Sequence, residues 1–383
     1  MVQSFSLPAY NYYGRGSLNN LSEILKRFNA EKVFIVSDQN IASTGLVKKV
    51  SESIKQVGLK TAEYLDVNPE PTIENVELCL ENYKQSNCNL ILGLGGGSPL
   101  DTAKGVAILA SGDGGILDYI GVDMAPKRTV PLFLIPTTAG TGSEVTGIAI
   151  FSDKTDKMKK GIVSNNLIAD VAIVDSELTL SMPPAVTAAT GMDALTHAIE
   201  SYTATRATMQ TDLHALKAIE LISRSLRKAV VSGSDALARE DISIGSVFAG
   251  IALGNAGVGA VHACAYPIGG RFDTGHGLTN AVLLPFLMKH NLVADLKKFA
   301  DIAIALGENV EGLTLQEQAE RSYHAVTELS KDIGIPGNLS HLGVTREDVP
   351  GLAEAAMQVS RLMDNNVKIL TQADVEECLY DAL

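Results

Sequence analysis

One carboxylate and three imidazoles in the second half of the chain are the side-chain types that bind a divalent metal ion. The segment GMDALTHAIE places Asp193 and His197 four residues apart in a helical pattern, which sets both on one helix face. His262 and His276 follow in a glycine-rich stretch. Because no thiolate joins them, the set suits Fe²⁺, Zn²⁺, Mn²⁺ or Co²⁺ and is not a cysteine-rich structural zinc site. A cation with one anionic ligand stays positively charged and can lower the pKa of an alcohol bound to it.

The remaining histidines show no such grouping. A single histidine on a helix is more often a core or surface residue than a metal ligand, and we expect that of His214, His290, His324 and His341.

The stretch LILGLGGGSPLDTAKG, residues 90–105, has the pattern of a phosphate-binding turn. We expect Ser98 to be the helix N-cap, Pro99 the first helical residue and Asp101 the partner in a capping box. The free N–H groups and the dipole of such a helix start attract a phosphate, although a tight turn without a ligand has the same pattern. The stretch is neither GxGxxG nor a Walker loop. Ahead of the helix, three residues without a Cβ let an anion approach closely: Gly95, Gly96 and Gly97.

Two further features suit a dinucleotide. The loop PTTAGTGSEVT, residues 136–146, follows a buried run and offers hydroxyl groups that suit ribose and phosphate oxygens, if it is more than a polar turn. Asp38 ends the run KVFIVSD, where a carboxylate can accept hydrogen bonds from a ribose diol and repel a 2′-phosphate. Asp38 therefore favours NAD over NADP, although Asp after a strand is also a common turn residue.

The elements that must position these residues differ between the two halves. In the first half, amphipathic helical segments, such as residues 18–28 and 41–57, alternate with short apolar runs, which indicates a parallel sheet covered by helices on both faces. The opening segment FSLPAYNYYG is expected to be an edge strand or hairpin with an unknown partner. The apolar runs are Lys32–Ser37, Asn89–Gly97, Val130–Pro136 and Val171–Asp175.

Beyond about residue 180 the pattern is helical throughout, beginning at Pro183 and Pro184, which suit a helix start. We therefore predict an α/β, Rossmann-like nucleotide-binding domain over residues 1–181. An all-helical metal-binding and catalytic domain is predicted over residues 182–383.

Composition limits the classes of function. A chain of 383 residues with 46% hydrophobic residues is long enough for two globular domains. Its net charge of −13 argues against nucleic acid as a partner. No run is long and apolar enough for a membrane span, and the first residues do not look like a signal peptide. The 4 cysteines form no CxxC pair and are expected to be free thiols of a cytoplasmic protein.

Four blocks in the chain, taken together, resemble the iron-containing (group III) alcohol dehydrogenase family: GGGSPLDTAKG, PTTAGTGSEVT, GMDALTHAIESY and HACAYPIGGRFDTGHGLTNAVLLP. They come in the family's order, and the likeness runs from about residue 5 to the end. The resemblance implies a dehydroquinate synthase-like fold with the active site between two domains. It also implies hydride transfer between a small alcohol or diol, or the matching aldehyde, and NAD(P), and a homodimer or larger homo-oligomer.

The resemblance assigns roles to individual residues. It makes Asp193, His197, His262 and His276 the ligands of Fe²⁺, with Zn²⁺ as the alternative. Leu178 would line the nucleotide cleft or belong to the core, as would Leu180. The cofactor-binding positions that match are Gly95, Gly96, Gly97, Ser98, Thr137, Thr138, Thr141 and Lys159.

Two positions depart from the family pattern. Many members carry a histidine, proposed to relay the proton, where this chain has Tyr266, and a phenol with a pKa near 10 is a weak base. Tyr266 and His276 are our candidate catalytic residues. Ala169 replaces a usual proline, and we expect only a local effect on the loop. The substrate pocket is expected to include Gly147, Ala149 and Phe151.

Several alternatives stay open on the sequence. A glycerol dehydrogenase-like zinc enzyme and a hydroxyacid–oxoacid transhydrogenase are the nearest. A non-enzymatic nucleotide-binding assembly protein is disfavoured by the intact ligand set. A dehydroquinate synthase-like lyase is disfavoured because we find no strongly basic pocket for a phosphorylated sugar acid.

Overall fold

The computed structural model describes residues 4–154 and 158–383. These residues form two compact units. The α/β unit consists of residues 6–138 and 142–179. The helical unit consists of residues 180–383 together with the short segment 139–141 and the described residues up to Phe5.

A six-stranded sheet, parallel throughout, forms the centre of the α/β unit, in the order β1-β9-β6-β4-β2-β3. The prediction of a parallel sheet is therefore confirmed, as is the edge strand near the start of the chain, whose partner is β9. The strands of this sheet are β1 (Tyr10–Tyr13), β2 (Lys32–Val36), β3 (Lys60–Tyr64), β4 (Leu90–Gly95), β6 (Leu132–Pro136) and β9 (Val171–Val174).

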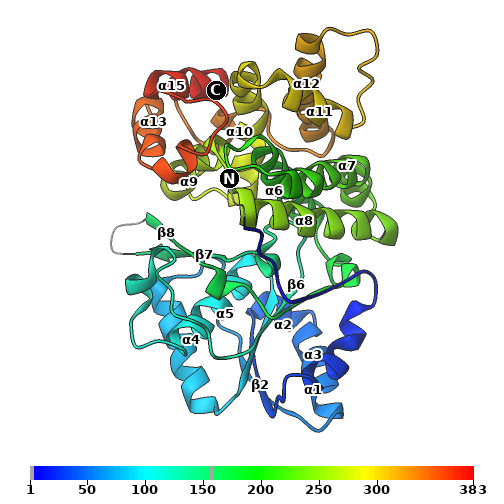
Figure 1. Cartoon of the computed structure of the whole chain (residues 1–383), viewed down its shortest axis with the longest axis vertical. Helices are drawn as coiled ribbons and strands as arrows, with labels where there is room; N and C mark the ends of the chain where they lie inside the picture. Colours follow the sequence, from blue (N-terminus) through cyan, green and yellow to red (C-terminus); the bar gives the residue numbers. More distant parts are fainter. Residues whose placement is uncertain (1–3, 155–157) are drawn as a thin grey trace. The chain divides into compact units, whose positions relative to one another are not determined.

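Helices cover both faces of the sheet because its central strands are apolar on both sides. In β2, Val33 and Ile35 pack with the helices of one face, and Phe34 and Val36 pack with those of the other. Figure 1 shows α1 and α3 on the first face and α4 and α5 on the second. The helices of this unit are α1 (Leu21–Lys26), α2 (Gln39–Ser43), α3 (Leu46–Gln56), α4 (Ile73–Ser86) and α5 (Gly97–Leu109).

Two predicted helices are each divided in the structure. The segment 41–57 is broken at Gly45, whose φ of +82° lies in the left-handed region that favours glycine, so that α2 ends before it and α3 begins after it. The segment 18–28 begins with a 3₁₀ turn before α1. The α/β unit has five 3₁₀ turns in its described part: Ser17–Asn20, Ile116–Tyr119, Ser143–Val145, Asn165–Leu167 and Ser176–Thr179.

A second, three-stranded sheet was not predicted from the sequence. Its strands are β5 (Gly121–Val122), β7 (Ile148–Asp153) and β8 (Met158–Val163), in the order β5-β8-β7, with β7 and β8 antiparallel. The lysines in β8 give this strand a weak apolar pattern, which explains the omission.

The residues expected in the substrate pocket lie in or next to strand β7 of the small sheet. Ala149 and Phe151 lie on the inner face of β7, and both are fully buried in the core beside α5. A Cβ at Gly147 would lie 2.5 Å from the carbonyl oxygen of Ser164, so this glycine is required by a close backbone approach. These three residues serve packing, and the prediction that Ala149 and Phe151 line an accessible pocket was wrong.

The helical unit is built around α6, which begins at the predicted proline pair, with Pro183 as N-cap and Pro184 as first residue. From Gly191 to Thr203 every residue of α6 is buried. No strand occurs in residues 180–383, all of which the structure describes. The helices are α6 (Pro184–Thr203), α7 (Met209–Val231), α8 (Ala236–Ala256), α9 (Ala260–Phe272), α10 (His276–Asn291), α11 (Leu296–Ala305), α12 (Leu315–Asp332), α13 (Val349–Met357), α14 (Ser360–Met363) and α15 (Gln372–Asp381), with 3₁₀ turns at Leu292–Ala294 and Leu339–Leu342.

Close packing and one buried arginine side chain hold α6 in place. A Cβ at Gly191 would overlap the Leu226 side chain, so this glycine lets α6 approach α7. Arg239, only 2% exposed, donates hydrogen bonds to Thr187 Oγ1 and to the carbonyl oxygen of Met182 at the start of α6. The start of α6 is thereby fixed two turns before the first candidate metal ligand.

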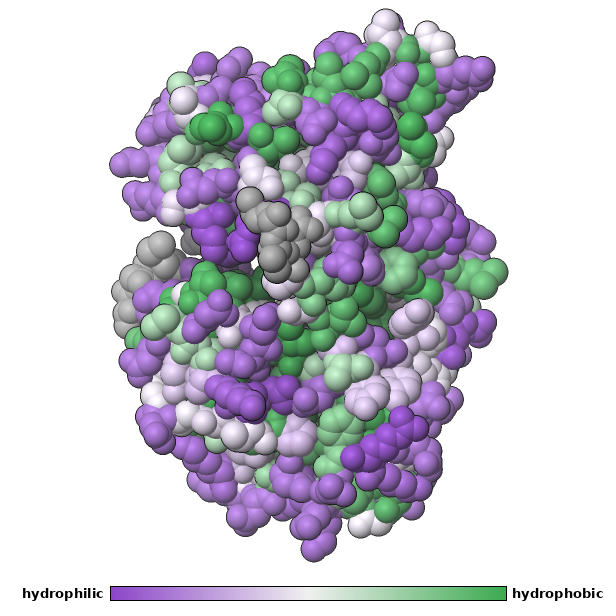
Figure 2. Space-filling model, in the orientation of Figure 1, coloured by the Kyte–Doolittle hydropathy of each residue, from purple (hydrophilic) through white to green (hydrophobic). Residues whose placement is uncertain are grey.

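The outer surface of the helical unit is mixed. In Figure 2 hydrophilic residues cover most of this unit's visible face, and hydrophobic residues form separate groups among them. Within the described ranges no single helix is long and apolar enough to cross a membrane, while α8 and α9 pass that test only as a pair bent by 101°.

Candidate metal centre and cofactor loops

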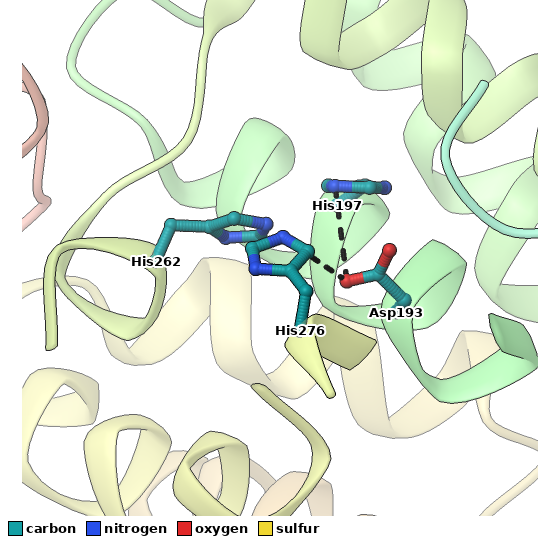
Figure 3. Close-up of side chains that lie close together, drawn as sticks. All are labelled: Asp193, His197, His262 and His276. Carbon is teal, nitrogen blue, oxygen red and sulfur yellow. Dashed lines mark ion pairs between the residues drawn. The ribbon is translucent and has the colours of Figure 1, made fainter. Parts of the chain in front are cut away.

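The four predicted metal ligands come together in the helical unit. Asp193 and His197 lie one turn apart on α6, His262 is the third residue of α9, and His276 is the first residue of α10. Each offers a ligand atom, and these atoms all lie within 4.8 Å of one another. Figure 3 shows the three imidazoles gathered around the Asp193 carboxylate, whose Oδ1 is 4.0 Å from Nε2 of His197 and 3.8 Å from Nε2 of His276.

The cluster is buried on one side and accessible on the other. Asp193, His197 and His262 are at most 5% exposed, whereas the side chain of His276 is 33% exposed. The rings of His197 and His262 are stacked, with centroids 4.8 Å apart. A cation held here would be shielded by three ligands and reachable by a small molecule on the side of the fourth.

The surroundings of the Asn280 side chain show that these residues fit a cation. Its Nδ2 lies 2.8 Å from Asp193 Oδ1 and 3.1 Å from Nε2 of both His262 and His276, so three ligand atoms point at one position. An amide NH₂ has two hydrogens and can satisfy only two of three acceptors. Asn280 Oδ1 is itself buried without a hydrogen-bond partner among the described residues. This surplus of lone pairs around one position is what a divalent cation requires.

The charges of the cluster also suit a metal. Burial alone would raise the pKa of Asp193, but the three histidines and the Asn280 amide outweigh it, and the pKa of Asp193 is lowered. The pKa of His197 is lowered, because the effect of burial outweighs the opposing effect of the Asp193 charge. Asp193 is therefore ionised and His197 neutral near pH 7, the forms in which both bind metal ions.

Sequence reasoning missed one charged residue of this site, Glu200. It lies on α6 seven residues after Asp193 and three after His197, which places it on the same helix face, and it is 6% exposed. Its Oε2 is 2.5 Å from Nδ1 of His262, and its Oε1 accepts a hydrogen bond from the N–H of Val261. The spacing i, i+4, i+7 on one face was the available signal.

The glycine turn joins β4 to α5 as predicted, but its helix start differs. Gly95 has φ +152°, and a Cβ there would lie 2.6 Å from Pro99 Cγ. The N-cap is Gly96, and α5 begins at Gly97. The predicted capping box of Ser98 and Asp101 was therefore wrong.

Both residues of the expected capping box have other partners. The hydroxyl of Ser98 donates to the carbonyl oxygen of Pro69. Asp101 accepts hydrogen bonds from Ser143 Oγ and from the N–H of Ile150. Asp101 therefore links α5 both to the second loop, through Ser143, and to β7, through Ile150.

A buried lysine strengthens this attachment. Lys104 of α5 is fully buried and donates to Ser143 Oγ, to Thr146 Oγ1 and to the carbonyl oxygen of Ile148. Burial lowers its pKa to about 8. In this way the helix of the first loop holds the carboxyl end of the second loop in place.

The hydroxyl-rich loop itself lies beside the glycine turn. Thr137 donates its N–H to the carbonyl oxygen of Gly95, and its Oγ1 is buried without a hydrogen-bond partner in the described part of the chain. Thr138 is half-buried, and a Cβ at Gly96 would lie 3.5 Å from its Cγ2. Thr141 is half-buried and belongs to the helical unit.

The tip of this loop contacts α6 inside the helical unit. Ala139 is part of the core of that unit. A Cβ at Gly140 would lie 2.7 Å from Thr190 Cβ. A polar contact between the Gly140 backbone and His197 raises the pKa of His197, against the larger effect of burial. The loop tip is therefore next to a candidate metal ligand.

The other predicted cofactor residues lie in varied surroundings. Asp38 follows β2, is half-buried and caps α2 by accepting a hydrogen bond from the N–H of Ile41. Lys159 on β8 donates to Glu70 Oε1 at 2.9 Å. Leu178 is partly buried against the α/β core, whereas Leu180 is 37% exposed.

Among the remaining predicted residues, Tyr266 lies near the cluster. It is half-buried on α9, and its ring centroid is 6.0 Å from that of His276. Ala169 is buried in the α/β core. All four cysteines are free and buried. The other histidines lie outside the metal cluster: His214, His290, His324 and His341.

Comparison with known proteins covers both units. Residues 8–176 match the family model for iron-containing alcohol dehydrogenase, and residues 187–383 match the model for the C-terminal part of the Fe-containing alcohol dehydrogenase family. The chain belongs to the iron-containing alcohol dehydrogenase family.

Relatives agree with this family over the whole length. The chain is 43% identical to long-chain-alcohol dehydrogenase 1 of Geobacillus thermodenitrificans (strain NG80-2), with 100% of this chain and 96% of that protein covered. It is 39% identical to the NAD-dependent methanol dehydrogenase of Bacillus methanolicus, with 100% of both covered. A solved 1,3-propanediol oxidoreductase superposes with a TM-score of 0.98 at 38% identity, also with 100% of both chains covered.

These findings confirm the predicted fold class and reaction class. The protein has the dehydroquinate synthase-like fold of iron-containing alcohol dehydrogenases, and it is an oxidoreductase that acts on alcohols and the matching aldehydes.

Proposed function

We propose that this member of the family is an NAD-dependent dehydrogenase of small uncharged alcohols or diols that uses Fe²⁺ held by Asp193, His197, His262 and His276. The observation that carries the proposal is the convergence of four ligand atoms within 4.8 Å of one another on a partly accessible site. One carboxylate and three imidazoles suit Fe²⁺ and Zn²⁺ alike, and the family favours iron.

The reaction divides between the bound groups and the chain's own residues. When bound, the cation supplies a Lewis acid for the alcohol oxygen, and the nicotinamide supplies the hydride acceptor. Asp193 provides the single negative charge among the ligands, which leaves the site electrophilic. His276 marks the accessible side, from which the alcohol approaches. Tyr266, next to His276, is the proposed relay that passes the alcohol proton towards water.

The cofactor contacts are proposed at the two loops. Gly95, Gly96, Gly97 and Ser98 would contact the pyrophosphate at the start of α5, where free N–H groups and the helix dipole favour an anion. Three threonines of the second loop, together with Asp101, Lys159, Leu178 and Leu180, complete the proposed set. Of the threonines, Thr137 has the strongest support because its buried hydroxyl lacks a partner in the described residues, whereas Thr138 and Thr141 follow from the loop pattern.

The preference for NAD is proposed from Asp38. Its Oδ1 accepts from the N–H of Ile41, which holds the carboxylate at the end of β2. A fixed carboxylate at this place would accept a ribose diol and repel a 2′-phosphate. The NAD-dependent methanol dehydrogenase among the relatives is consistent with this choice.

The substrate class is proposed from the relatives. The three relatives described above are named for long-chain alcohols, methanol and 1,3-propanediol, all of which are uncharged. An uncharged alcohol, diol or aldehyde is therefore the proposed substrate, and a small one is favoured by the methanol and 1,3-propanediol enzymes.

Location and assembly are proposed on separate grounds. The four free cysteines fit the reducing cytoplasm. Strand β1 is an edge of the six-stranded sheet, and Tyr10 and Tyr13 on it are 48% and 55% exposed. An edge strand offers backbone groups to a second copy, so we propose a homodimer or larger homo-oligomer, which sedimentation equilibrium would test.

One experiment tests the central proposal. Protein purified without metal is loaded with Fe²⁺ or Zn²⁺, and alcohols, diols and aldehydes are screened with NAD and NADP. Asp193→Asn, which removes the anionic ligand at nearly constant volume, should lose the metal and most activity while keeping its circular dichroism. Asp364→Asn, an exposed residue of the same unit, is the matched control. Full activity of metal-free protein would refute the proposal, and activity with Zn²⁺ alone would favour the zinc-enzyme alternative.

A further inference from the structure

We infer that Glu200 is a positioning residue of the metal centre: its carboxylate holds His262 in the tautomer that presents Nε2 to the cation. The inference rests on the proposed function, because it assumes that His262 is a metal ligand. The observation behind it is the single carboxylate that contacts both His262 Nδ1 and the backbone N–H beside it.

Glu200 is placed by two helices at once. It projects from α6, the helix that also carries Asp193 and His197. Its Oε1 is 2.7 Å from the N–H of Val261, the second residue of α9, so it satisfies one of the free N–H groups at the start of that helix. A Cβ at Gly259 would lie 3.3 Å from the same oxygen, so the glycine before α9 leaves room for the carboxylate.

The contacts of His262 determine which of its two ring nitrogens carries the proton. Glu200 Oε2, 2.5 Å away, is an acceptor, so Nδ1 of His262 carries the hydrogen. In a neutral imidazole, Nε2 then has the free lone pair, and it faces the Asn280 amide 3.1 Å away. His262 therefore presents to the cluster the one nitrogen that can bind a cation.

The substitution Glu200→Gln tests the inference, because glutamine cannot accept hydrogen bonds from both donors at once. Glutamate offers two oxygens to two donors, the N–H of Val261 and Nδ1–H of His262, whereas glutamine offers one oxygen and one NH₂. The N–H of Val261 cannot become an acceptor, so the amide must direct its NH₂ at His262 or break the contact at α9. Facing NH₂, Nδ1 of His262 becomes an acceptor, and the proton moves to Nε2, where it blocks metal binding.

The first measurement is metal affinity, determined by competition with a chelator. Glu200→Gln should weaken Fe²⁺ or Zn²⁺ binding by about 10- to 100-fold, the range seen when such supporting contacts are lost. Glu354→Gln, an exposed glutamate on α13, should bind as tightly as the wild type. Selective ¹⁵N labelling of histidine in the metal-free protein should show His262 as the Nδ1–H tautomer in the wild type and not in Glu200→Gln.

A double-mutant cycle separates positioning from a general effect of charge. If Glu200 acts through His262, Glu200→Gln should change metal affinity less than about threefold in a His262→Ala background. An equal loss in both backgrounds would overturn the inference, because the carboxylate would then act on the cation directly. Unchanged affinity and tautomer in Glu200→Gln would also overturn it. If that variant does not fold, Glu200→Asp replaces it, and wild-type affinity with this shorter side chain would count against the inference.

The outcomes for the two proposals are distinguishable. Wild-type protein that fails to bind a metal would refute the proposed function. Wild-type protein that binds a metal as tightly as Glu200→Gln does would refute only the inference.

Discussion

Gly140 and Thr190 are in direct contact: a Cβ at Gly140 would lie 2.7 Å from Thr190 Cβ and 3.0 Å from the carbonyl oxygen of Thr190. Thr190 stands on α6 three residues before Asp193. The tip of the hydroxyl-rich loop is thus pressed against the helix that carries two candidate metal ligands, and any side chain at Gly140 must displace one or the other.

Gly140→Ala is therefore expected to lower both stability and metal affinity. The added methyl group meets backbone, which cannot move aside as a flexible side chain can, and overpacking of this kind costs about 1–3 kcal/mol. Thermal unfolding and chelator competition would measure the two effects. Gly337→Ala, where a Cβ has nothing within 4 Å, should match the wild type in both. Equal metal affinity in the two variants would contradict the prediction.

Gly95→Ala should weaken NAD binding. The glycine has φ +152°, and a Cβ would lie 2.6 Å from the ring of Pro99, so the turn before α5 must rearrange. We expect a loss of affinity of at least about tenfold, equal to 1.4 kcal/mol, by fluorescence titration with NADH. Gly115→Ala is the control in the same unit, because its φ is −85° and the nearest atom to its Cβ is 3.8 Å away.

Asp38→Asn should raise the use of NADP relative to NAD. The amide keeps an oxygen for the N–H of Ile41, so the cap of α2 survives while the charge that repels a 2′-phosphate is removed. The ratio of kcat/KM for NADP over NAD should rise by about tenfold, or 1.4 kcal/mol. An unchanged ratio would remove Asp38 from cofactor selection.

Tyr266→Phe should slow turnover without loss of metal. The hydroxyl is the proposed proton relay beside His276, and loss of a general acid–base group costs about 10²-fold in kcat. Metal content and KM for the alcohol should stay near the wild type. Tyr323→Phe on α12 serves as control. If kcat and its pH profile were the same for Tyr266→Phe and the wild type, another group or water would carry the proton.

Glu144→Gln should change how stability depends on pH. Burial raises the pKa of Glu144 to about 7, whereas in the unfolded chain it titrates near 4.5. A raised pKa means that its stabilising contribution is full below about pH 4.5 and is lost as pH rises through 7. In the wild type the free energy of unfolding should therefore fall across this window, by at most about 3 kcal/mol.

The variant removes this slope, and denaturation between pH 4.5 and 7.5 in the presence of EDTA would show it. Lys104, whose pKa is lowered to about 8, titrates mainly above that window. Glu63→Gln, an exposed residue of β3, should keep the wild-type slope. A slope equally steep in Glu144→Gln would assign it to other groups.

The parallel sheet and the start of the helical unit could be predicted because their signals are local. Runs such as Lys32–Ser37 are apolar on both faces, and Pro183 and Pro184 mark a helix start. The grouping of Asp193 with His197 follows from helix geometry alone. The meeting of these two with His262 and His276 depends on how three helices pack, so residue types and spacing could only suggest it, and the family resemblance strengthened the prediction before the structure.

What could not be predicted depends on partners distant in sequence. Ser98 and Asp101 match a capping box, but Ser98 bonds to Pro69, and Asp101 bonds to Ser143 and Ile150, all outside the helix. The spacing of Glu200 places it on the helix face of Asp193 and His197, but its contact with His262 depends on how α9 packs against α6. In each case a tertiary contact outweighs the local pattern.

The hydrogen bonds of Asn280 bear on which metal the enzyme carries. Ligand atoms of α6, α9 and α10 already lie 2.8–3.1 Å from its amide nitrogen, so the arrangement is preorganised and a cation can bind there without a rearrangement of the helices. Preorganised ligands of this kind raise the affinity for any divalent cation that suits one carboxylate and three imidazoles. The metal found after purification would then depend on which metal ions were available in the cell and in the buffers. It would also depend on affinity, because such ligands bind Zn²⁺ more tightly than Fe²⁺.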